Sequence, residues 1–235
     1  MILGLHPVRE AIRVHGERLE KVLVERGTSA QLEAVARFAT DRGAKVERVA
    51  RGDLDRLAHG GRHQGAIAFA PELTLVRLED VDTGPGALVV VLDELEDPQN
   101  FGAVIRSAVA FGATAIVWPE HHAAPLTAAT FRASAGAIEH ATLCRVTAIP
   151  TALAELKERG LRAIGLDPQA DAELATMDLK APVAIVVGAE GKGLRRTVKH
   201  ACDALARLPI APTVGSLNAS VAAAVALYET TRQRA

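Results

Sequence analysis

Residues 87–112 read ALVVVLDELEDPQNFGAVIRSAVAFG and contain one complete strand-to-helix unit. The first six residues, Ala87–Leu92, are continuously apolar and rich in valine, which is typical of a strand buried on both faces. Asn100 is a residue type that caps helices, so we expect a helix whose early turns carry Gly102 and Arg106. The Arg106 side chain should point back toward the strand end. A doubly buried strand followed by a helix predicts a parallel α/β sheet.

The alternation of strands and helices continues beyond this stretch. Further runs of apolar and β-branched residues follow, and a helical stretch separates each from the next, so one parallel sheet should hold them all. Ligands bind at the carboxyl ends of the strands in such sheets. The expected strands are Thr114–Trp118, Leu143–Val146, Arg162–Leu166 and Ala184–Val187.

The first 70 residues show a second, smaller α/β pattern. Apolar residues from Leu32 to Ala39 recur at helical spacing and form a one-sided stripe, so this helix should pack on one face of a small sheet. The helices are expected at His6–Val14, Ser29–Arg42 and Asp53–Leu57, and the strands at Lys21–Glu25, Lys45–Val49 and Gly65–Phe69.

A polar stretch separates the two patterns. Residues 71–86 carry four acidic residues and end in Thr-Gly-Pro-Gly, a composition suited to turns and not to a core. We therefore expect an N-terminal domain at residues 1–70, a linker at 71–86 and a larger domain at 87–235. The length of 235 residues, with 49% hydrophobic residues, is sufficient for two domains.

The net charge of −1 is not that of a strongly basic nucleic-acid binder. Residues 1–70 hold 12 Lys and Arg against 9 Asp and Glu, whereas residues 71–235 hold 15 against 19. The N-terminal domain is thus the better candidate for contacts with phosphates. An ordinary solvated surface explains so small an excess equally well.

The two cysteines, Cys144 and Cys202, lie in apolar surroundings without metal-ligand spacing. Free buried thiols are expected, and neither a disulfide nor a metal site is indicated. The first residues carry charges and do not form a signal peptide, and no run of about 20 apolar residues exists to span a bilayer. We expect a cytoplasmic protein with no membrane partner.

Two further loops follow expected strands and carry unusual residues. Residues 188–193 read GAEGKG, a glycine turn whose backbone can contact a nucleoside, with Glu190 at the mouth of the pocket. Its spacing differs from the dinucleotide fingerprint, which disfavours an NAD site. Residues 208–229 read LPIAPTVGSLNASVAAAVALYE, where we expect Ser216 at the start of a helix and Asn218 in its first turn. A purely structural interpretation of the three loops is also open. In it, Asn100 and Ser216 only cap helices, Arg106 forms a surface salt bridge, and residues 188–193 form an ordinary glycine turn.

Together the three loops resemble the SpoU/TrmH class of SPOUT ribose methyltransferases. The motifs are N-x-G-x-x-x-R-S-A at Asn100–Ala108, G-x-E-G-x-G-L at Gly188–Leu194 and S-L-N-x-S-V-A at Ser216–Ala222. They cover residues 87–235 in the order and at the spacing of the family. The stretch GLHPVREA at residues 4–11, with the small α/β unit after it, resembles the substrate-binding domain of RlmB-like members.

The resemblance implies a fold and a cofactor. The fold is a SPOUT domain with a mostly parallel sheet and a deep trefoil knot, an exception to the rule that chains do not thread loops, joined to a small L30e-like domain. The cofactor is S-adenosylmethionine, held in the knot largely by backbone groups, with no metal and with the site completed across a homodimer. Carried over to this sequence, the cofactor-binding residues are Gly188, Leu208 and Leu217, with Ile210 and Gly193 close by.

The resemblance also implies the catalytic residues, which are Arg106, Asn100, Glu190, Ser216 and Asn218. A ribose 2′-hydroxyl is a poor nucleophile that must lose its proton as it attacks, so the site needs a base and accurate positioning. The motif arginine is proposed in the family to act on this hydroxyl. Because a free guanidinium stays protonated, a charged Arg106 that orients a phosphate and polarises the hydroxyl fits the position at lower cost. The other four residues would fix Arg106 and the ribose through hydrogen bonds.

The expected function is 2′-O-methylation of a guanosine in 23S ribosomal RNA by a homodimer. The alternatives are a transfer-RNA ribose methyltransferase, a resistance-type enzyme acting on an rRNA adenosine, and a non-catalytic RNA-binding protein. The N-terminal domain disfavours the first, because tRNA-specific relatives usually recognise RNA through short terminal extensions, and the intact motifs disfavour the last. Two positions depart from the family pattern: Phe101 replaces a smaller aliphatic residue, and Pro212 stiffens the third loop.

Overall fold

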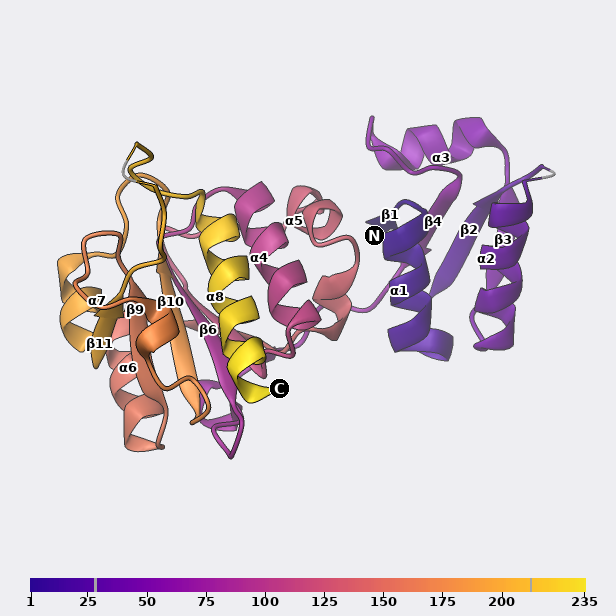
Figure 1. Cartoon of the computed structure of the whole chain (residues 1–235). Coiled ribbons are helices and arrows are strands. Elements are labelled where there is room, and N and C mark those ends of the chain that lie inside the picture. The colour runs from indigo at the N-terminus through magenta and orange to yellow at the C-terminus, as the bar shows by residue number, and fades with distance from the viewer. Residues whose placement is uncertain (28, 212) are drawn as a thin grey trace. The chain divides into compact units, whose positions relative to one another are not determined.

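The apolar run that opens the quoted stretch forms β6 (Leu88–Asp93), the central strand of a seven-stranded sheet (Figure 1). The computed structural model describes residues 1–27, 29–211 and 213–235. Their contacts divide the chain into two units, which we describe separately. Unit 1 comprises Met1–Leu73 and Leu126–His140, and unit 2 comprises Thr74–Pro125 and Ala141–Ala235.

The sheet of unit 2 has the order β11-β9-β10-β6-β7-β8-β5. Each neighbouring pair of strands is parallel, so the predicted parallel α/β sheet is confirmed. The remaining strands are β5 (Leu75–Val76), β7 (Ala115–Pro119), β8 (Leu143–Val146), β9 (Arg162–Leu166), β10 (Val183–Gly188) and β11 (Ala204–Ala206).

Both faces of this sheet are buried, as the continuous apolar runs predict. Val89 and Val91 of β6 belong to one apolar cluster with Leu153 of α6, and the alternating Val90 and Leu92 are at most 1% exposed. Helix α8 packs against α4 and β10. The helices of unit 2 are α4 (Pro98–Ala110), α6 (Ile149–Glu158), α7 (Arg196–Ala201) and α8 (Ala219–Arg234), with the short 3-10 helices η2 (Leu78–Asp80) and η4 (Leu174–Thr176).

Unit 1 is a small sheet of order β1-β4-β2-β3 with helices on both faces. Strands β2 and β3 are parallel, and β4 is antiparallel to both β1 and β2. Val22 and Val24 of β2 pack with α1 and α2, whereas the alternating Leu23 packs with Leu54 of α3. Helix α2 buries the predicted stripe from Leu32 to Ala39. The elements are β1 (Ile2–Leu3), α1 (Leu5–His15), η1 (Gly16–Arg18), β2 (Lys21–Glu25), α2 (Ala30–Asp41), β3 (Val46–Val49), α3 (Arg51–Ala58) and β4 (Ala66–Phe69).

The stretch expected to be a linker contains regular structure. Strand β5 pairs with β8 at the edge of the unit 2 sheet, and Val81 is buried in the apolar cluster of that unit. The Arg159 guanidinium donates a hydrogen bond to the backbone carbonyl of Leu78 (2.8 Å). Residues 75–81 therefore pack as part of unit 2.

A second segment departs from the expected organisation. Leu126–His140 lies in sequence between β7 and β8, yet it contacts α1 and β1 and groups with unit 1. It forms α5 (Ala128–Ala133) and the 3-10 helix η3 (Ala137–His140). No helix in the described part of the chain is long and apolar enough to cross a membrane.

Candidate active site

A cavity of about 240 Å³ lies beside the carboxyl ends of β9 and β10 in unit 2. Its walls come from the loop after β9, the glycine turn after β10, and the segment between β11 and α8. All five residues expected to bind the cofactor, Gly188, Gly193, Leu208, Ile210 and Leu217, line it. The sheet order brings these loops together, because β9 and β10 are neighbours and β11 adds to the outer edge of β9.

The glycine turn after β10 depends on a close approach between two backbone segments. A Cβ added to Gly188 would lie 2.2 Å from the Gly193 carbonyl carbon and 2.4 Å from the Leu194 nitrogen. The Gly193 amide donates to the Ala189 carbonyl (2.9 Å) and closes the turn. Gly191 and Gly193 adopt φ values of +78° and +66°, which disfavour residues with a side chain. The turn therefore offers backbone groups to the cavity.

A half-buried ion pair fixes the end of this turn. Asp93, fully buried at the end of β6, accepts hydrogen bonds from the backbone amide (2.9 Å) and the Nε (2.8 Å) of Arg195. The hydrogen bond to Asp93 raises the pKa of Arg195. Because Arg195 directly precedes α7, this pair fixes the exit of the glycine turn to the central strand.

A carboxylate also faces the cavity. Asp167 follows β9, is 8% exposed, and pairs with the Lys199 ammonium at 2.5 Å while accepting from the Gln169 amide (2.9 Å). Burial alone would raise the pKa of the Asp167 carboxyl, but these two hydrogen bonds and the positive charge of Lys199 hold the pKa below its usual value. Asp167 is thus an ionised acceptor in the cavity wall, and we did not anticipate it because nothing in its sequence context distinguishes it from a turn residue.

Three of the expected catalytic residues meet in one hydrogen-bonded network. Asn100 Nδ2 donates to Glu190 Oε2 (3.0 Å), and Asn218 Nδ2 donates to Asn100 Oδ1 (2.9 Å) and to Glu190 Oε2 (3.2 Å). Asn100 is only 7% exposed, so its amide is committed to these partners. The network joins α4, the glycine turn and the start of α8, which are remote in sequence.

Both predictions about helix capping are wrong. The cap of α4 is Asp97, whose carboxylate accepts from the Gln99 amide (3.0 Å), and Asn100 lies in the first turn. The cap of α8 is Asn218, which accepts from the amides of Ser220 and Val221, so Ser216 lies in the loop before the helix. Pro98 at the start of α4 is compatible with the earlier cap, because proline lacks the amide that a first-turn residue leaves unpaired.

Arg106 and Ser216 stand apart from this network. Ser216 is exposed and lines the cavity. Arg106 is exposed on α4 and forms no hydrogen bond or ion pair with a described residue of the chain. Phe101, the departure from the motif, is 1% exposed and packs against Trp118 with ring centroids 5.4 Å apart, whereas Pro212 lies outside the described residues.

An apolar groove runs along α4 and α8 beside Arg106. Ala103 and Ser107 of α4 line it, and on α8 it exposes three large apolar side chains, Val221 (47%), Val225 (41%) and Tyr228 (56%). Isolated exposed apolar residues are common, but three at helical spacing in one groove form a patch suited to a protein contact.

The arrangement suits a small ligand with an apolar body and polar edges. Backbone groups of the glycine turn supply donors and acceptors, Leu208, Ile210 and Leu217 supply apolar walls, and Asp167 supplies a charged acceptor. Glu190 belongs to the same turn, but it is held by two amides and does not line the cavity, contrary to its expected place at the mouth of the pocket.

Comparisons with known proteins agree with this geometry. A family model described as the SpoU rRNA Methylase family matches residues 87–228, and one described as RNA 2′-O ribose methyltransferase substrate binding matches residues 1–76. A Bacillus subtilis (strain 168) protein named putative TrmH family tRNA/rRNA methyltransferase YacO is 38% identical over 238 residues, covering 99% of this chain and 95% of the relative.

Solved structures show similar matches. The SpoU methyltransferase AviRb from Streptomyces viridochromogenes, in complex with AdoMet, is 26% identical with a TM-score of 0.80, covering 99% of this chain and 89% of that one. An AdoMet-bound rRNA methyltransferase from Sinorhizobium meliloti is 26% identical with a TM-score of 0.80, covering 98% and 85%. A TrmH/SpoU tRNA modifying enzyme from A. aeolicus is 25% identical with a TM-score of 0.57, and covers only 67% of this chain and 80% of its own.

Proposed function

This chain belongs to the SpoU rRNA methylase family and is an S-adenosylmethionine-dependent RNA 2′-O-ribose methyltransferase, and from that premise we propose that it methylates a guanosine ribose in 23S ribosomal RNA. The observation that carries the proposal is that one chain combines the motif-lined cavity with the family's substrate-binding domain.

The cavity of unit 2 is the proposed cofactor site. Its residues fit S-adenosylmethionine: the Gly188–Gly193 turn offers backbone groups where a Cβ would not fit, and the apolar side chains suit a nucleoside. Asp167 can accept hydrogen bonds from hydroxyl or amino groups. When bound, S-adenosylmethionine supplies an activated methyl group. We assign cofactor binding to Gly188, Leu208 and Leu217, with Gly193 and Ile210 adjacent.

The groove along α4 and α8 is the proposed homodimer contact. Its exposed side chains Val221, Val225 and Tyr228 would be covered by the same surface of a second copy. Arg106 lies on α4 between two groove-lining residues, Ala103 and Ser107, and has no partner among the described residues of its own chain. A second copy would bring Arg106 to the cavity of its partner, which accounts for its separation from the network around Glu190.

The proposed catalytic roles follow from this arrangement. A charged Arg106 binds an RNA phosphate and polarises the 2′-hydroxyl, because its planar guanidinium can hold two oxygens at once. The network of Asn100, Glu190 and Asn218 fixes the glycine turn and leaves Glu190 Oε1 without a hydrogen bond to a described residue, so that this oxygen can accept from the ribose. Ser216, exposed at the cavity, would orient the ribose from the opposite loop.

The N-terminal unit favours rRNA over tRNA as substrate. The match to the S. meliloti rRNA methyltransferase covers 98% of this chain, whereas the match to the tRNA modifying enzyme leaves a third of it without a counterpart. We assign RNA recognition to the N-terminal domain, residues 1–70, and methyl transfer to residues 87–235.

Two further features belong to the same proposal. By its family, the chain should also form a trefoil knot around the glycine turn; strand β11 lies at the edge of the sheet, and α8, which follows it, packs on β10. An enzyme that modifies ribosomal RNA during its processing would act in the cytoplasm.

The test is a map of 2′-O-methylation across all rRNA and tRNA in cells that lack this protein. We expect loss of one guanosine modification in 23S rRNA, restored by the native gene and by Arg145→Ala, but not by Arg106→Ala. Arg145 is a matched control because it is an exposed arginine of unit 2 that lines neither the cavity nor the groove. A loss confined to tRNA, or to an rRNA adenosine, would overturn the assignment.

A further inference from the structure

The segment Leu126–His140 is contiguous in sequence with unit 2 but belongs to unit 1 by its contacts. The chain therefore passes between the two units at three points: after Leu73, after Pro125 and after His140. The first crossing would suffice to join two domains. The other two exist only because this segment is docked.

Docking involves a close backbone approach to α1. Gly136, with φ +87°, lies so near that a Cβ added there would be 2.8 Å from Glu10 Cβ and 3.0 Å from Pro7 Cα. Phe131 of α5 packs against the apolar cluster beneath α1 and α2. Pro7 and Glu10 both belong to the GLHPVREA stretch, so part of that motif packs against the segment Leu126–His140 of the same chain.

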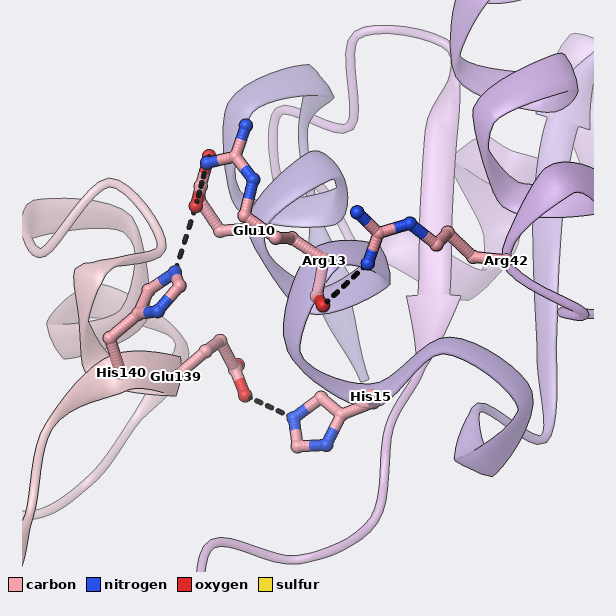
Figure 2. Close-up of polar contacts among 6 residues, drawn as sticks. All are labelled: Glu10, Arg13, His15, Arg42, Glu139 and His140. Atoms are coloured by element: carbon pink, nitrogen blue, oxygen red, sulfur yellow. Dashed lines mark hydrogen bonds and ion pairs between the residues drawn. The ribbon is translucent and has the colours of Figure 1, made fainter.

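Two histidine–carboxylate pairs complete the contact (Figure 2). His15 Nε2 lies 2.6 Å from Glu139 Oε2, and His140 Nε2 lies 2.8 Å from Glu10 Oε2, which also accepts from Arg13. The pairs differ in exposure: the side chains of His15 and Glu139 are 10% and 1% exposed, against 34% and 20% for His140 and Glu10. The second pair contributes little because water competes for it, so the first supplies most of the polar part of the contact.

The contacts of His15 define which atom of the buried pair donates the hydrogen bond. The Arg18 guanidinium lies 3.4 Å from His15 Nδ1 and can only donate, so Nδ1 accepts and the ring proton lies on Nε2, facing Glu139. Glu139 Oε1 is buried without a hydrogen-bond partner among the described residues. The carboxyl group therefore depends on His15, and loss of His15 would leave it buried without any hydrogen-bond partner among the described residues.

We propose that Leu126–His140 is a clasp, held on α1 by the buried His15–Glu139 pair, that couples RNA bound by unit 1 to methyl transfer in unit 2. Breaking the pair releases the segment, which lowers the rate of RNA methylation and leaves cofactor binding intact. The coupling rests on the proposed function, whereas the docking does not.

Hydrogen exchange of the full-length protein, measured by mass spectrometry, tests the docking. His15→Leu should speed exchange of the amides in α5 and η3 by about tenfold or more, because the buried Glu139 side chain loses its hydrogen-bond partner. The double variant His15→Leu/Glu139→Leu should restore slow exchange, since neither residue then leaves an unpaired group. His59→Asn is the matched control: His59 is exposed, forms no hydrogen bond or ion pair with a described residue, and has a φ of +45° that asparagine tolerates.

Methyl transfer to rRNA and calorimetry with S-adenosylmethionine test the coupling. We expect His15→Leu to lower methyl transfer by about tenfold or more with cofactor affinity changed less than about twofold, and the double variant to recover transfer. Unchanged exchange in His15→Leu would show that the pair does not hold the segment, and faster exchange with undiminished transfer would show that docking does not couple the units. If the native protein transfers no methyl group to rRNA, the proposed substrate is wrong and the clasp is judged by the exchange result alone.

Discussion

Substitution of Gly188 by alanine probes the geometry of the glycine turn most directly. The added Cβ would lie 2.2 Å from the Gly193 carbonyl carbon, whereas ordinary contacts begin at 3.4 Å, so a backbone segment must move by about 1.2 Å. Backbone cannot change rotamer to escape, so the cost should reach or exceed the upper end of overpacking penalties, about 3 kcal/mol. Loss of the Gly193–Ala189 hydrogen bond that closes the turn would add about 1 kcal/mol.

Two measurements check this expectation. Urea denaturation should show that Gly188→Ala destabilises unit 2 by about 4 kcal/mol, a large part of the 5–15 kcal/mol that stabilises a typical domain. Calorimetry should show that affinity for S-adenosylmethionine falls by about 100-fold or more, equivalent to about 2.8 kcal/mol, because the displaced turn forms the cavity wall.

A variant of the same loop separates the clash from a general sensitivity of the turn. A Cβ at Gly191 would meet no atom within 4 Å, so Gly191→Ala carries only the strain of its φ of +78°, about 1–2 kcal/mol. If Gly188→Ala were no less stable than Gly191→Ala and bound the cofactor with native affinity, the close approach would not be essential and the reasoning would be refuted.

Four further predictions concern other parts of unit 2. Arg106→Ala should abolish methyl transfer while cofactor affinity stays within a few-fold, and Arg106→Lys should rescue little because it lacks the planar fork; a cofactor affinity that falls in parallel with activity would contradict the assigned role. In denaturant titration, Asp93→Ala should lower the free energy of unfolding by about 2–3 kcal/mol, which is less than for a fully buried pair because Arg195 is partly exposed. A loss well below about 2 kcal/mol would show that the pair is dispensable. Tyr228→Glu should convert the proposed dimer to a monomer in light scattering, and a native protein that is already monomeric at micromolar concentration would remove the dimer from the proposal. Burial raises the pKa of the Cys144 thiol to about 11, so little thiolate forms at pH 8 and iodoacetamide should label the native protein about 100-fold more slowly than the unfolded chain; comparable rates would show that the thiol is accessible.

The sequence by itself determined the longer strands and the parallel order of the larger sheet, but not the short strands β1, β5 and β11. Continuous apolar runs such as Ala87–Leu92 leave few alternatives to a doubly buried strand, and β6 begins one residue later than expected. The apolar stripe on α2 could be predicted because helical periodicity is a local property of the sequence. The family resemblance pointed to Gly188, Leu208 and Leu217, and the structure brings all three to the wall of one cavity.

The capping errors show how a local rule competes with a distant contact. Asn100 and Ser216 have side chains suited to caps, but Asp97 and Asn218 take those positions. The Asn100 amide is instead used by Glu190 and Asn218, 90 and 118 residues away in sequence. Helix capping depends on about four adjacent residues. The hydrogen-bonded network of Asn100, Glu190 and Asn218 depends instead on how the sheet brings three loops together.

Only the tertiary structure assigned the segment Leu126–His140 to unit 1. Its sequence shows a short helix between two strands of the larger sheet, and nothing local distinguishes it from an ordinary crossover. Its placement depends on Gly136 meeting Pro7 and on the buried pair of His15 with Glu139, residues 124 positions apart. Side-chain pairing across such a separation follows from the packing of completed elements, because burial removes the water that would otherwise satisfy each polar group separately.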